Sequence, residues 1–179
     1  MTQEFRYGLK IPKERIAVLI GKDGKTKKQI EIETKTVIEV DSKEGEVFIQ
    51  GKDALDLFGA REVVKSIARG FNPEIALLLL KGDYCLDMIS IADFSRNKND
   101  LIRIKGRLIG REGKSRKTIE ELTETHISIY GKTISIIGLP ENVANARKAL
   151  ENLIKGASHA NVYKGLEKKR RNIKLKEMI

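Results

Sequence analysis

Two short runs of the sequence carry the residue types of a phosphate-binding loop. Gly24-Lys25-Thr26 and Gly113-Lys114-Ser115 both match the last three residues of a Walker A motif, in which main-chain N–H groups and a lysine bind nucleotide phosphates. That motif also needs a glycine five residues before the first of these three, and positions 19 and 108 are both Leu. A nucleotide-hydrolysing enzyme is therefore a disfavoured alternative, whose signature would be Mg²⁺-dependent nucleotide binding.

The chain contains an internal duplication. Residues 19–40 align with residues 108–129, and eleven of these 22 positions are identical. Later segments pair as well, 47–51 with 134–138 and 60–70 with 146–156. Both copies keep Gly-x-x-Gly and both lack the additional Walker glycine, so the Gly-x-x-Gly turn is the repeated unit to which we assign function.

Each copy has the hydrophobic periodicity of a β-α-α-β-β-α unit. In the first copy the pattern predicts strands at 5–11, 36–41 and 46–51 and helices at 13–20, 25–33 and 54–69, the last with Asp53 as N-cap. In the second copy it predicts strands at 84–94, 126–130 and 133–138 and helices at 100–109, 114–122 and from Pro140 to near Gly156. A polar insertion, SRNKN, precedes the first helix of the second copy.

The predicted domain organisation follows from these elements. Residues 1–70 form the first domain and 84–156 the second, while 71–83 form a connecting helical segment and 157–179 a basic C-terminal tail. The connecting segment is so apolar that we expect it to pack the two domains rigidly together. The tail holds seven Lys and Arg against two Glu, a net charge of +5. It is either a basic helix that lies on RNA or a frayed terminus that aids solubility, and both alternatives stay open.

Composition narrows the class of protein. The 179 residues carry a net charge of +10, which favours a polyanionic partner. Cys85 is the single cysteine and His126 and His159 are the two histidines, so we expect no metal site, no cofactor, no nucleophile–base pair and a reducing, cytoplasmic compartment. The longest apolar run, residues 75–80, is too short to span a bilayer, and no N-terminal signal is visible. Many Ile, Lys and Glu residues indicate a thermophilic source.

A duplicated β-α-α-β-β-α unit with Ile-Gly-x-x-Gly between its first two helices resembles the type I KH domain, a module that binds single-stranded RNA. The motif stands at Ile20–Gly24 and again at Ile109–Gly113, and the resemblance covers residues 5–156. With the tail SHANVYKGLEKKRR, the chain is similar to the archaeal tandem KH-domain factors of small-subunit ribosome assembly. The resemblance implies an α+β fold of two type I KH domains. Eukaryotic relatives lack Gly-x-x-Gly in their first KH domain, whereas the first copy here is intact.

The resemblance implies that the two turns and the residues around them bind RNA. Glycines without Cβ atoms let a sugar–phosphate backbone approach the main chain, and the next helix presents free N–H groups to a phosphate. Basic side chains, Lys27 among them, surround the turns, and we expect Asp23 and Glu112 to point to solvent. Bases would enter an adjoining aliphatic groove, although each isoleucine taken singly is more often a core residue. The predicted RNA-binding residues are Ile20, Gly21, Lys22, Asp23, Gly24, Lys25, Lys28, Ile38, Ile109, Gly110, Arg111, Glu112, Gly113, Lys114, Ser115, Arg116, Lys117, Ile127 and Ile129.

The function that the resemblance implies is non-catalytic binding of single-stranded RNA near the 3′ end of small-subunit rRNA. It also implies two protein partners, a Nob-type endonuclease and a translation initiation factor alpha subunit, and no membrane partner. Other KH-domain roles remain as alternatives, namely mRNA binding, a part in RNA degradation, or a protein scaffold whose KH units no longer bind RNA. Aromatic residues make up only 5% of the chain, which disfavours domains that stack bases on aromatic rings.

Overall fold

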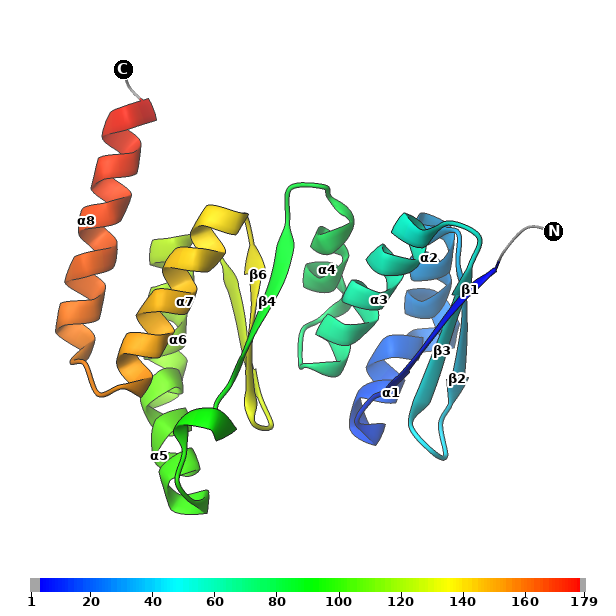
Figure 1. Cartoon of the computed structure of the whole chain (residues 1–179), viewed down its shortest axis with the longest axis horizontal. Helices are drawn as coiled ribbons and strands as arrows, with labels where there is room; N and C mark the ends of the chain where they lie inside the picture. Colours follow the sequence, from blue (N-terminus) through cyan, green and yellow to red (C-terminus); the bar gives the residue numbers. More distant parts are fainter. Residues whose placement is uncertain (1–3, 178–179) are drawn as a thin grey trace. The chain divides into compact units, whose positions relative to one another are not determined.

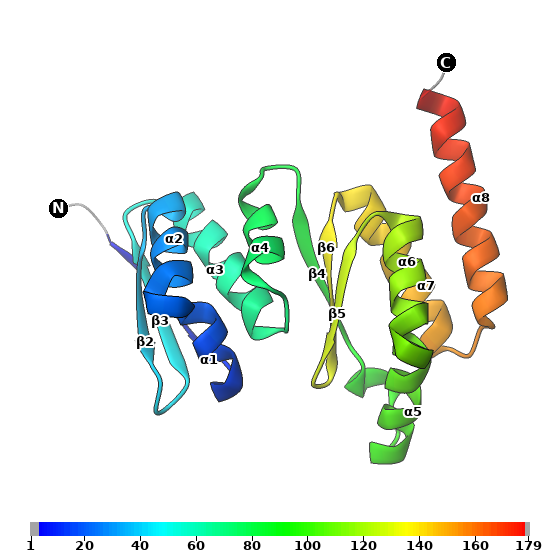
Figure 2. The ribbon, with the colours of Figure 1, turned by 180° about the vertical axis from the view of Figure 1, so that it is seen from behind.

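The structure, a computed structural model, describes residues 4–177 and divides into two compact units that meet in sequence between Tyr84 and Cys85. Each unit is an α+β fold in which helices cover one face of a three-stranded antiparallel sheet (Figures 1 and 2). The unit up to Tyr84 is called the first unit and the unit from Cys85 the second. None of the described helices is both long enough and apolar enough to cross a membrane.

The first unit follows the predicted order of elements. Its sheet has the strand order β1-β3-β2, with β3 paired to both neighbours. The elements are β1 (Phe5–Lys10), α1 (Lys13–Ile20), a 3₁₀ turn at Lys22–Gly24, α2 (Lys25–Thr34), β2 (Val37–Asp41), β3 (Glu46–Gly51), α3 (Ala54–Ala68), α4 (Pro73–Ala76) and a 3₁₀ turn at Leu77–Leu80.

Local chemistry explains where the elements of the first unit begin and pack. The Asp53 carboxylate accepts hydrogen bonds from the N–H groups of Leu55 and Asp56, which confirms the predicted N-cap of α3. Alternate residues of β3, Val47 and Ile49, are fully buried toward the helices. The segment predicted to connect the domains is helical, and it packs on α3 within the first unit.

The second unit repeats this arrangement with the strand order β4-β6-β5. Its elements are β4 (Cys85–Ser90), a 3₁₀ turn at Ala92–Phe94, α5 (Lys98–Ile109), a 3₁₀ turn at Arg111–Gly113, α6 (Lys114–Thr123), β5 (His126–Tyr130), β6 (Thr133–Gly138), α7 (Pro140–Ile154) and α8 (His159–Glu177).

Two predicted boundaries in the second unit are wrong. The strand expected over 84–94 ends at Ser90, because Ile91 is buried with its N–H donating to Lys132 O at 2.8 Å and the chain then turns. The helix expected from 100 begins at Lys98, because the Asn97 side chain accepts from Asp100 N at 2.9 Å and caps it there. Part of the polar insertion therefore belongs to α5.

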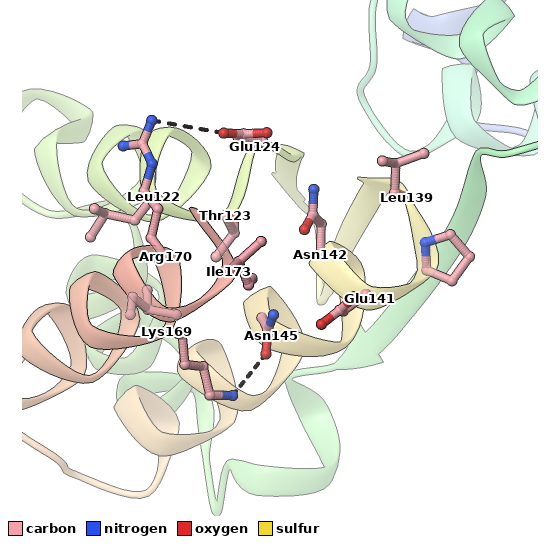
Figure 3. Close-up of a pocket in the computed structure, with 12 residues that line it drawn as sticks. Leu122, Thr123, Glu124, Leu139, Glu141, Asn142, Asn145, Lys169, Arg170 and Ile173 are labelled. Atoms are coloured by element: carbon pink, nitrogen blue, oxygen red, sulfur yellow. Dashed lines mark hydrogen bonds and ion pairs between the residues drawn. The ribbon is translucent and has the colours of Figure 1, made fainter. Parts of the chain in front are cut away.

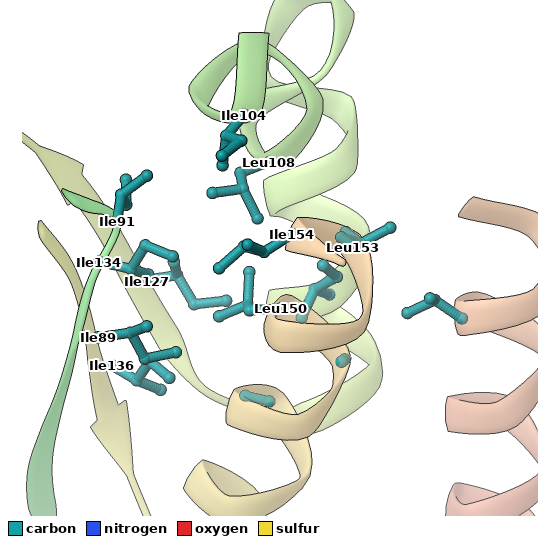
Figure 4. Close-up of a cluster of buried hydrophobic side chains, with 14 of the residues drawn as sticks. Ile89, Ile91, Ile104, Leu108, Ile127, Ile134, Ile136, Leu150, Leu153 and Ile154 are labelled. Carbon is teal, nitrogen blue, oxygen red and sulfur yellow. The ribbon is translucent and has the colours of Figure 1, made fainter. Parts of the chain in front are cut away.

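The core of the second unit lies between its sheet and its helices, as Figure 4 shows. Ile127, Ile134 and Ile136 project from the sheet toward Leu108 of α5 and Leu150 of α7. All five side chains are almost fully buried. The isoleucines at alternate strand positions are thus packing residues, as the periodicity indicates.

The basic tail is a docked helix. α8 contacts α6 and α7, and Val162 and Leu166 are both 6% exposed in the core of the second unit. Lys169 Nζ donates to Asn145 Oδ1 at 2.7 Å, and His159 Nε2 lies 2.9 Å from Arg107 O. The frayed-terminus alternative is therefore wrong for the described part of the tail. RNA contact by α8 stays a prediction.

We predict that the docking of α8 stabilises the second unit. Replacing Leu166 with Ala should lower the free energy of unfolding by about 2–3 kcal/mol, because it removes a buried side chain and leaves a cavity. Leu175 lies on the same helix and is 61% exposed, so Leu175→Ala should change that free energy by less than about 0.5 kcal/mol. Urea unfolding of both variants checks this, and equal losses would contradict the docking.

Candidate nucleic-acid interface

The first glycine of each Gly-x-x-Gly turn is required by packing inside the unit. Gly21 ends α1 with φ 72° and ψ 176°, a backbone conformation open essentially to glycine alone. A Cβ atom at Gly21 would lie 2.9 Å from Thr26 N, in the first turn of α2. Gly110 repeats this, since its Cβ would lie 2.7 Å from Ser115 N. These glycines therefore let two helices meet closely, a role that differs from the predicted approach of RNA.

The second glycine of each turn faces open space. Gly24 has φ 74° and ψ 11°, and a Cβ atom there would meet only Lys28 Cε, at 3.9 Å. Gly113 has φ 75° and ψ 11°, and its Cβ would meet only Lys117 Cε, at 4.0 Å. A ligand can thus approach the main chain at Gly24 and Gly113, where the nearest side-chain atom is the flexible end of a lysine.

The helix that follows each turn starts without a side-chain cap. Gly24 and Gly113 are the N-cap residues of α2 and α6, and neither helix receives a side-chain hydrogen bond at this end. The N–H groups of the first helical turn and the positive end of the helix dipole therefore face outward. The exposed basic side chains around these ends are Lys22, Lys25 and Lys28 in the first unit and Arg111, Lys114 and Lys117 in the second. Each arrangement is suited to binding an anion.

The acidic residue of each turn occupies the left-handed region. Asp23 has φ 53° and Glu112 has φ 54°, and both side chains are exposed, as predicted. Ser115 is only 3% exposed and lies behind Gly110, so its hydroxyl is directed into the unit. We therefore assign the Ser115 side chain to packing.

Two basic residues near the turns bind the edge of the sheet. In the first unit Lys27 Nζ donates to Ile38 O at 2.7 Å and pairs with Glu31 at 2.9 Å, while Glu31 accepts from Ile38 N at 2.7 Å. In the second unit Arg116 Nη1 donates to Ile127 O at 3.3 Å. These contacts fix the helix after each turn on the edge strand β2 or β5. Two of the basic side chains that the sequence analysis placed around the RNA-binding turns are therefore occupied by contacts within the protein.

In the second unit Glu120 also contacts the edge strand β5. Glu120 Oε1 accepts from Ile127 N at 2.7 Å, and Arg116 Nε lies 3.9 Å from Glu120 Oε2. The helix-to-strand contacts of the first unit are thus repeated with Arg in place of Lys. The sequence alignment pairs these residues but does not reveal that they bind main-chain groups.

Fewer isoleucines are available to line the candidate groove than the sequence pattern suggests. Ile38 and Ile127 are 1% and 2% exposed and belong to the two cores, which is the packing role favoured for single isoleucines. The predicted aliphatic residues that keep accessible surface are Ile20, Ile109 and Ile129, all half-buried. These three side chains are the ones available to contact a base.

Val40 is a candidate that sequence reasoning missed. Alternate residues of an antiparallel edge strand direct their N–H and C=O groups outward, and Ile38 does so toward Lys27 and Glu31. Val40, two residues on, therefore also directs its groups outward, and its side chain is half-buried. The internal repeat aligns Val40 with Ile129, a predicted RNA-binding residue, and this alignment could have identified Val40 from the sequence. Such main-chain groups can hydrogen bond to the edge of a base.

A separate cleft of about 500 Å³ lies between α6, α7 and α8 (Figure 3). Leu139 and Ile173 contribute apolar surface, and Arg170 reaches toward Glu124 with the two groups 3.7 Å apart. The cleft is at the end of α6 away from Gly113, about 15 Å along a helix of this length. It is therefore distinct from the candidate interface.

Cys85 and the two histidines lie outside the two turns. Burial, and secondarily the charge of Asp87, raises the pKa of the Cys85 thiol, which keeps the thiol protonated at neutral pH. His126 lies on β5, and the His159 ring packs edge-on against Tyr163 with centroids 5.9 Å apart. Among residues 4–177, no three His, Cys, Asp or Glu side chains are grouped so that they could hold a metal ion.

Comparisons with known proteins cover both units. Residues 85–171 match the family model described as eukaryotic type KH-domain (KH-domain type I), and residues 6–66 match the KH domain model. The KH domain-containing protein MJ0443 of Methanocaldococcus jannaschii is 50% identical over 170 residues, 93% of this chain and 74% of that protein. The RNA-binding protein PNO1 of Oryzias latipes is 34% identical over 114 residues, 63% of this chain and 47% of that protein.

One solved structure extends the comparison to three dimensions. It is the crystal structure of an a/eIF2alpha–aDim2p–rRNA complex from Pyrococcus horikoshii OT3, in which the matching chain is 44% identical with a TM-score of 0.88. The match covers 94% of this chain and 96% of that chain. Two of these three relatives are archaeal, which agrees with the archaeal resemblance of the sequence.

We predict that the two glycines of each turn differ in their effect on stability. Gly21→Ala should cost at least about 2 kcal/mol of unfolding free energy, because it combines a disfavoured backbone conformation with a clash against α2. Gly24→Ala should cost about 1 kcal/mol, the left-handed penalty alone. Gly110→Ala and Gly113→Ala form a matched pair in the second unit. Thermal unfolding measures all four, and an equal cost within either pair would contradict the structural role of the first glycine.

Proposed function

Because the chain belongs to the PNO1/Dim2-type family of proteins with two KH domains, we propose that it holds single-stranded rRNA near the 3′ end of the small subunit during ribosome maturation. RNA binding in ribosome biogenesis is the family's activity. The rRNA in the aDim2p complex supports an rRNA target for this chain. The choice of the 3′ end rests on the resemblance of the whole chain to the archaeal tandem KH-domain factors of small-subunit ribosome assembly.

The observation that carries the proposal is the geometry of the two turns. Each one combines an uncapped helix N-terminus, open space in front of the second glycine and exposed basic side chains. A phosphate of a single strand can bind there, which positions the strand without reading its sequence. Ile20 with Val40, and Ile109 with Ile129, are then the groups placed to contact bases. Both turns are intact, so we propose that both units bind RNA.

The chain's own role is to hold RNA, with cleavage left to a partner. A Nob-type endonuclease is the partner that PNO1 homology supports, and a/eIF2alpha accompanies aDim2p in the solved complex. We therefore propose an endonuclease of that type and an initiation factor alpha subunit as partners in the cytoplasm. The protonated Cys85 thiol is a poor nucleophile, so Cys85 is not a candidate for nucleophilic catalysis.

We predict that reversing one charge in a turn weakens RNA binding. Lys22→Asp and Arg111→Asp should each lower affinity for a single-stranded RNA with the small-subunit 3′-end sequence by about tenfold, because each removes a phosphate contact and adds repulsion. The double variant should lose more than either single variant. Fluorescence anisotropy at two salt concentrations measures this, and each variant should also show a shallower salt dependence.

The matched control is Lys81→Asp, which makes the same charge change at an exposed residue after the Leu77–Leu80 turn. Lys81→Asp should leave RNA affinity nearly unchanged, because at about 0.1 M salt the interaction between an exposed charge and RNA is screened beyond about 10 Å. A shuffled RNA should bind more weakly than the 3′-end sequence. If the three turn variants bind RNA as tightly as the unaltered chain does, the turns are structural and RNA binding lies elsewhere.

A further inference from the structure

The outer edge of β1 carries main-chain groups that the sheet does not use. β1 is an edge strand, and its residues are exposed except for the half-buried Leu9. Ile38 of β2 directs its groups away from β3, so its partner Ile49 directs its own toward Tyr7 of β1. Gly8, the next residue, therefore directs its N–H and C=O away from the sheet. Two residues to either side, Arg6 and Lys10 do the same.

In the second unit side chains close the equivalent edge. Met88 of β4 stands at the position of Gly8, and its N–H donates to Asp87 Oδ1 at 2.8 Å. Arg147 of α7 donates to Met88 O at 3.4 Å and to both oxygens of Asp87 at 2.8 Å. The pair of Asp87 and Arg147 thus occupies the groups that an added strand would need. Natural sheets commonly protect an edge in such a way.

The described part of the first unit lacks this protection and has an apolar surface in its place. Tyr7 stands in place of Asp87, and Arg61 of α3 stands in place of Arg147. The Arg61 guanidinium lies over the Tyr7 ring at 5.3 Å and over the Phe58 ring at 4.7 Å, with Glu62 Oε1 3.1 Å from its Nη2. Within residues 4–177, no side chain covers Gly8 as Asp87 and Arg147 cover Met88.

The surface beside the open edge has the composition of a protein interface. Tyr7 is 36% exposed, Phe58 54% and Leu55 81%, and Arg61 is held between two rings. Tyrosine, phenylalanine and arginine are enriched at the centres of protein interfaces. The open edge supplies main-chain hydrogen bonds, and the aromatic rings supply side-chain contacts. Together they match the recognition of an extended peptide by strand addition.

We propose that the β1 edge binds an extended segment of a partner protein as a fourth strand, with acidic side chains opposite Arg6 and Lys10 and apolar side chains against Tyr7 and Phe58. The positive charges of Arg6 and Lys10 on β1 favour acidic residues at the facing positions of the partner segment. The Arg6 guanidinium lies over the Phe48 ring at 4.5 Å and pairs only loosely with Glu39, at 3.8 Å with both side chains 58% exposed. Because these contacts are at the surface, the exposed side of Arg6 can still pair with a carboxylate of a partner. This docking surface is separate from the turns proposed to bind RNA.

Charge argues against a second copy of the chain as the occupant. Two β1 strands paired antiparallel about Gly8 would place Arg6 of each copy opposite Lys10 of the other. Like charges directly opposite each other destabilise a strand pair. A different protein that carries acidic residues at those places fits the edge better.

A peptide titration of the full chain tests the proposal. The probe is a synthetic peptide of alternating glutamate and valine, and the readout is hydrogen exchange at single amides. The outward N–H groups of Arg6, Gly8 and Lys10 should become protected when the peptide is added, while those of β4 should not change. Absence of protection at these three amides would overturn the proposal.

Two variants examine the mode of binding. Gly8→Pro removes the central outward N–H and keeps every β1–β3 hydrogen bond, so it should weaken peptide binding by at least about tenfold. The Phe48 ring, 3.1 Å from an added Cβ at Gly8, has to shift slightly. The double variant R6E/K10E makes exposed changes only, and should bind a peptide of alternating lysine and valine in place of the acidic one. Unchanged acidic-peptide binding by either folded variant contradicts strand addition.

Two further measurements separate this proposal from RNA binding and from self-association. Gly8→Pro should bind RNA as the unaltered chain does, and the double variant K22D/R111D should still bind the peptide. If RNA protects the β1 amides instead, the edge belongs to the RNA site and the proposal fails. A dimer in sedimentation that Gly8→Pro dissociates would show that a second copy is the occupant, which also overturns it.

Discussion

The contact between Gly21 and the first turn of α2 is the constraint on which the rest of each unit depends, and Gly110 repeats it with α6. Because no Cβ atom stands between the two helices, the chain can reverse direction within four residues. The reversal leaves the N-terminus of the second helix without a side-chain cap, and so creates the candidate anion site as a by-product of packing. The glycine needed for close packing and the glycine proposed to face RNA are different residues of one motif.

A second set of contacts sets the position of the helix relative to the sheet. Lys27 and Glu31 in the first unit bind the outward groups of one residue in the edge strand, and Arg116 and Glu120 do so in the second. The next outward position of each strand stays available beside the turn. Basic residues near the turn thus divide into two kinds, those that hold the sheet edge and those exposed around the helix end. The positive charge of the sequence does not by itself separate them.

Much of the fold could be predicted because local signals and the repeat agree. Asp53 caps α3 as its side chain and position predict, and the alternation in β3 marks the buried face. The prediction failed, or left alternatives open, where tertiary contacts decide the outcome. Ser90 ends a strand because Ile91 is drawn into the core, and α8 docks through Val162 and Leu166, two apolar residues in a run dominated by charge. The open edge beside Gly8 depends on the register in which β1 pairs with β3, and the amino-acid composition does not specify that register.

We propose that RNA phosphates bind at the uncapped helix ends and that bases bind at the outward edges of β2 and β5. A titration of the ¹⁵N-labelled chain with single-stranded rRNA 3′-end sequence tests it directly, by chemical shift changes of individual amides. Binding of this kind should produce the largest changes at Lys25 and Lys114 and at Val40 and Ile129. Changes concentrated on α8, with the turns unaffected, would contradict it and would assign RNA binding to the docked basic helix.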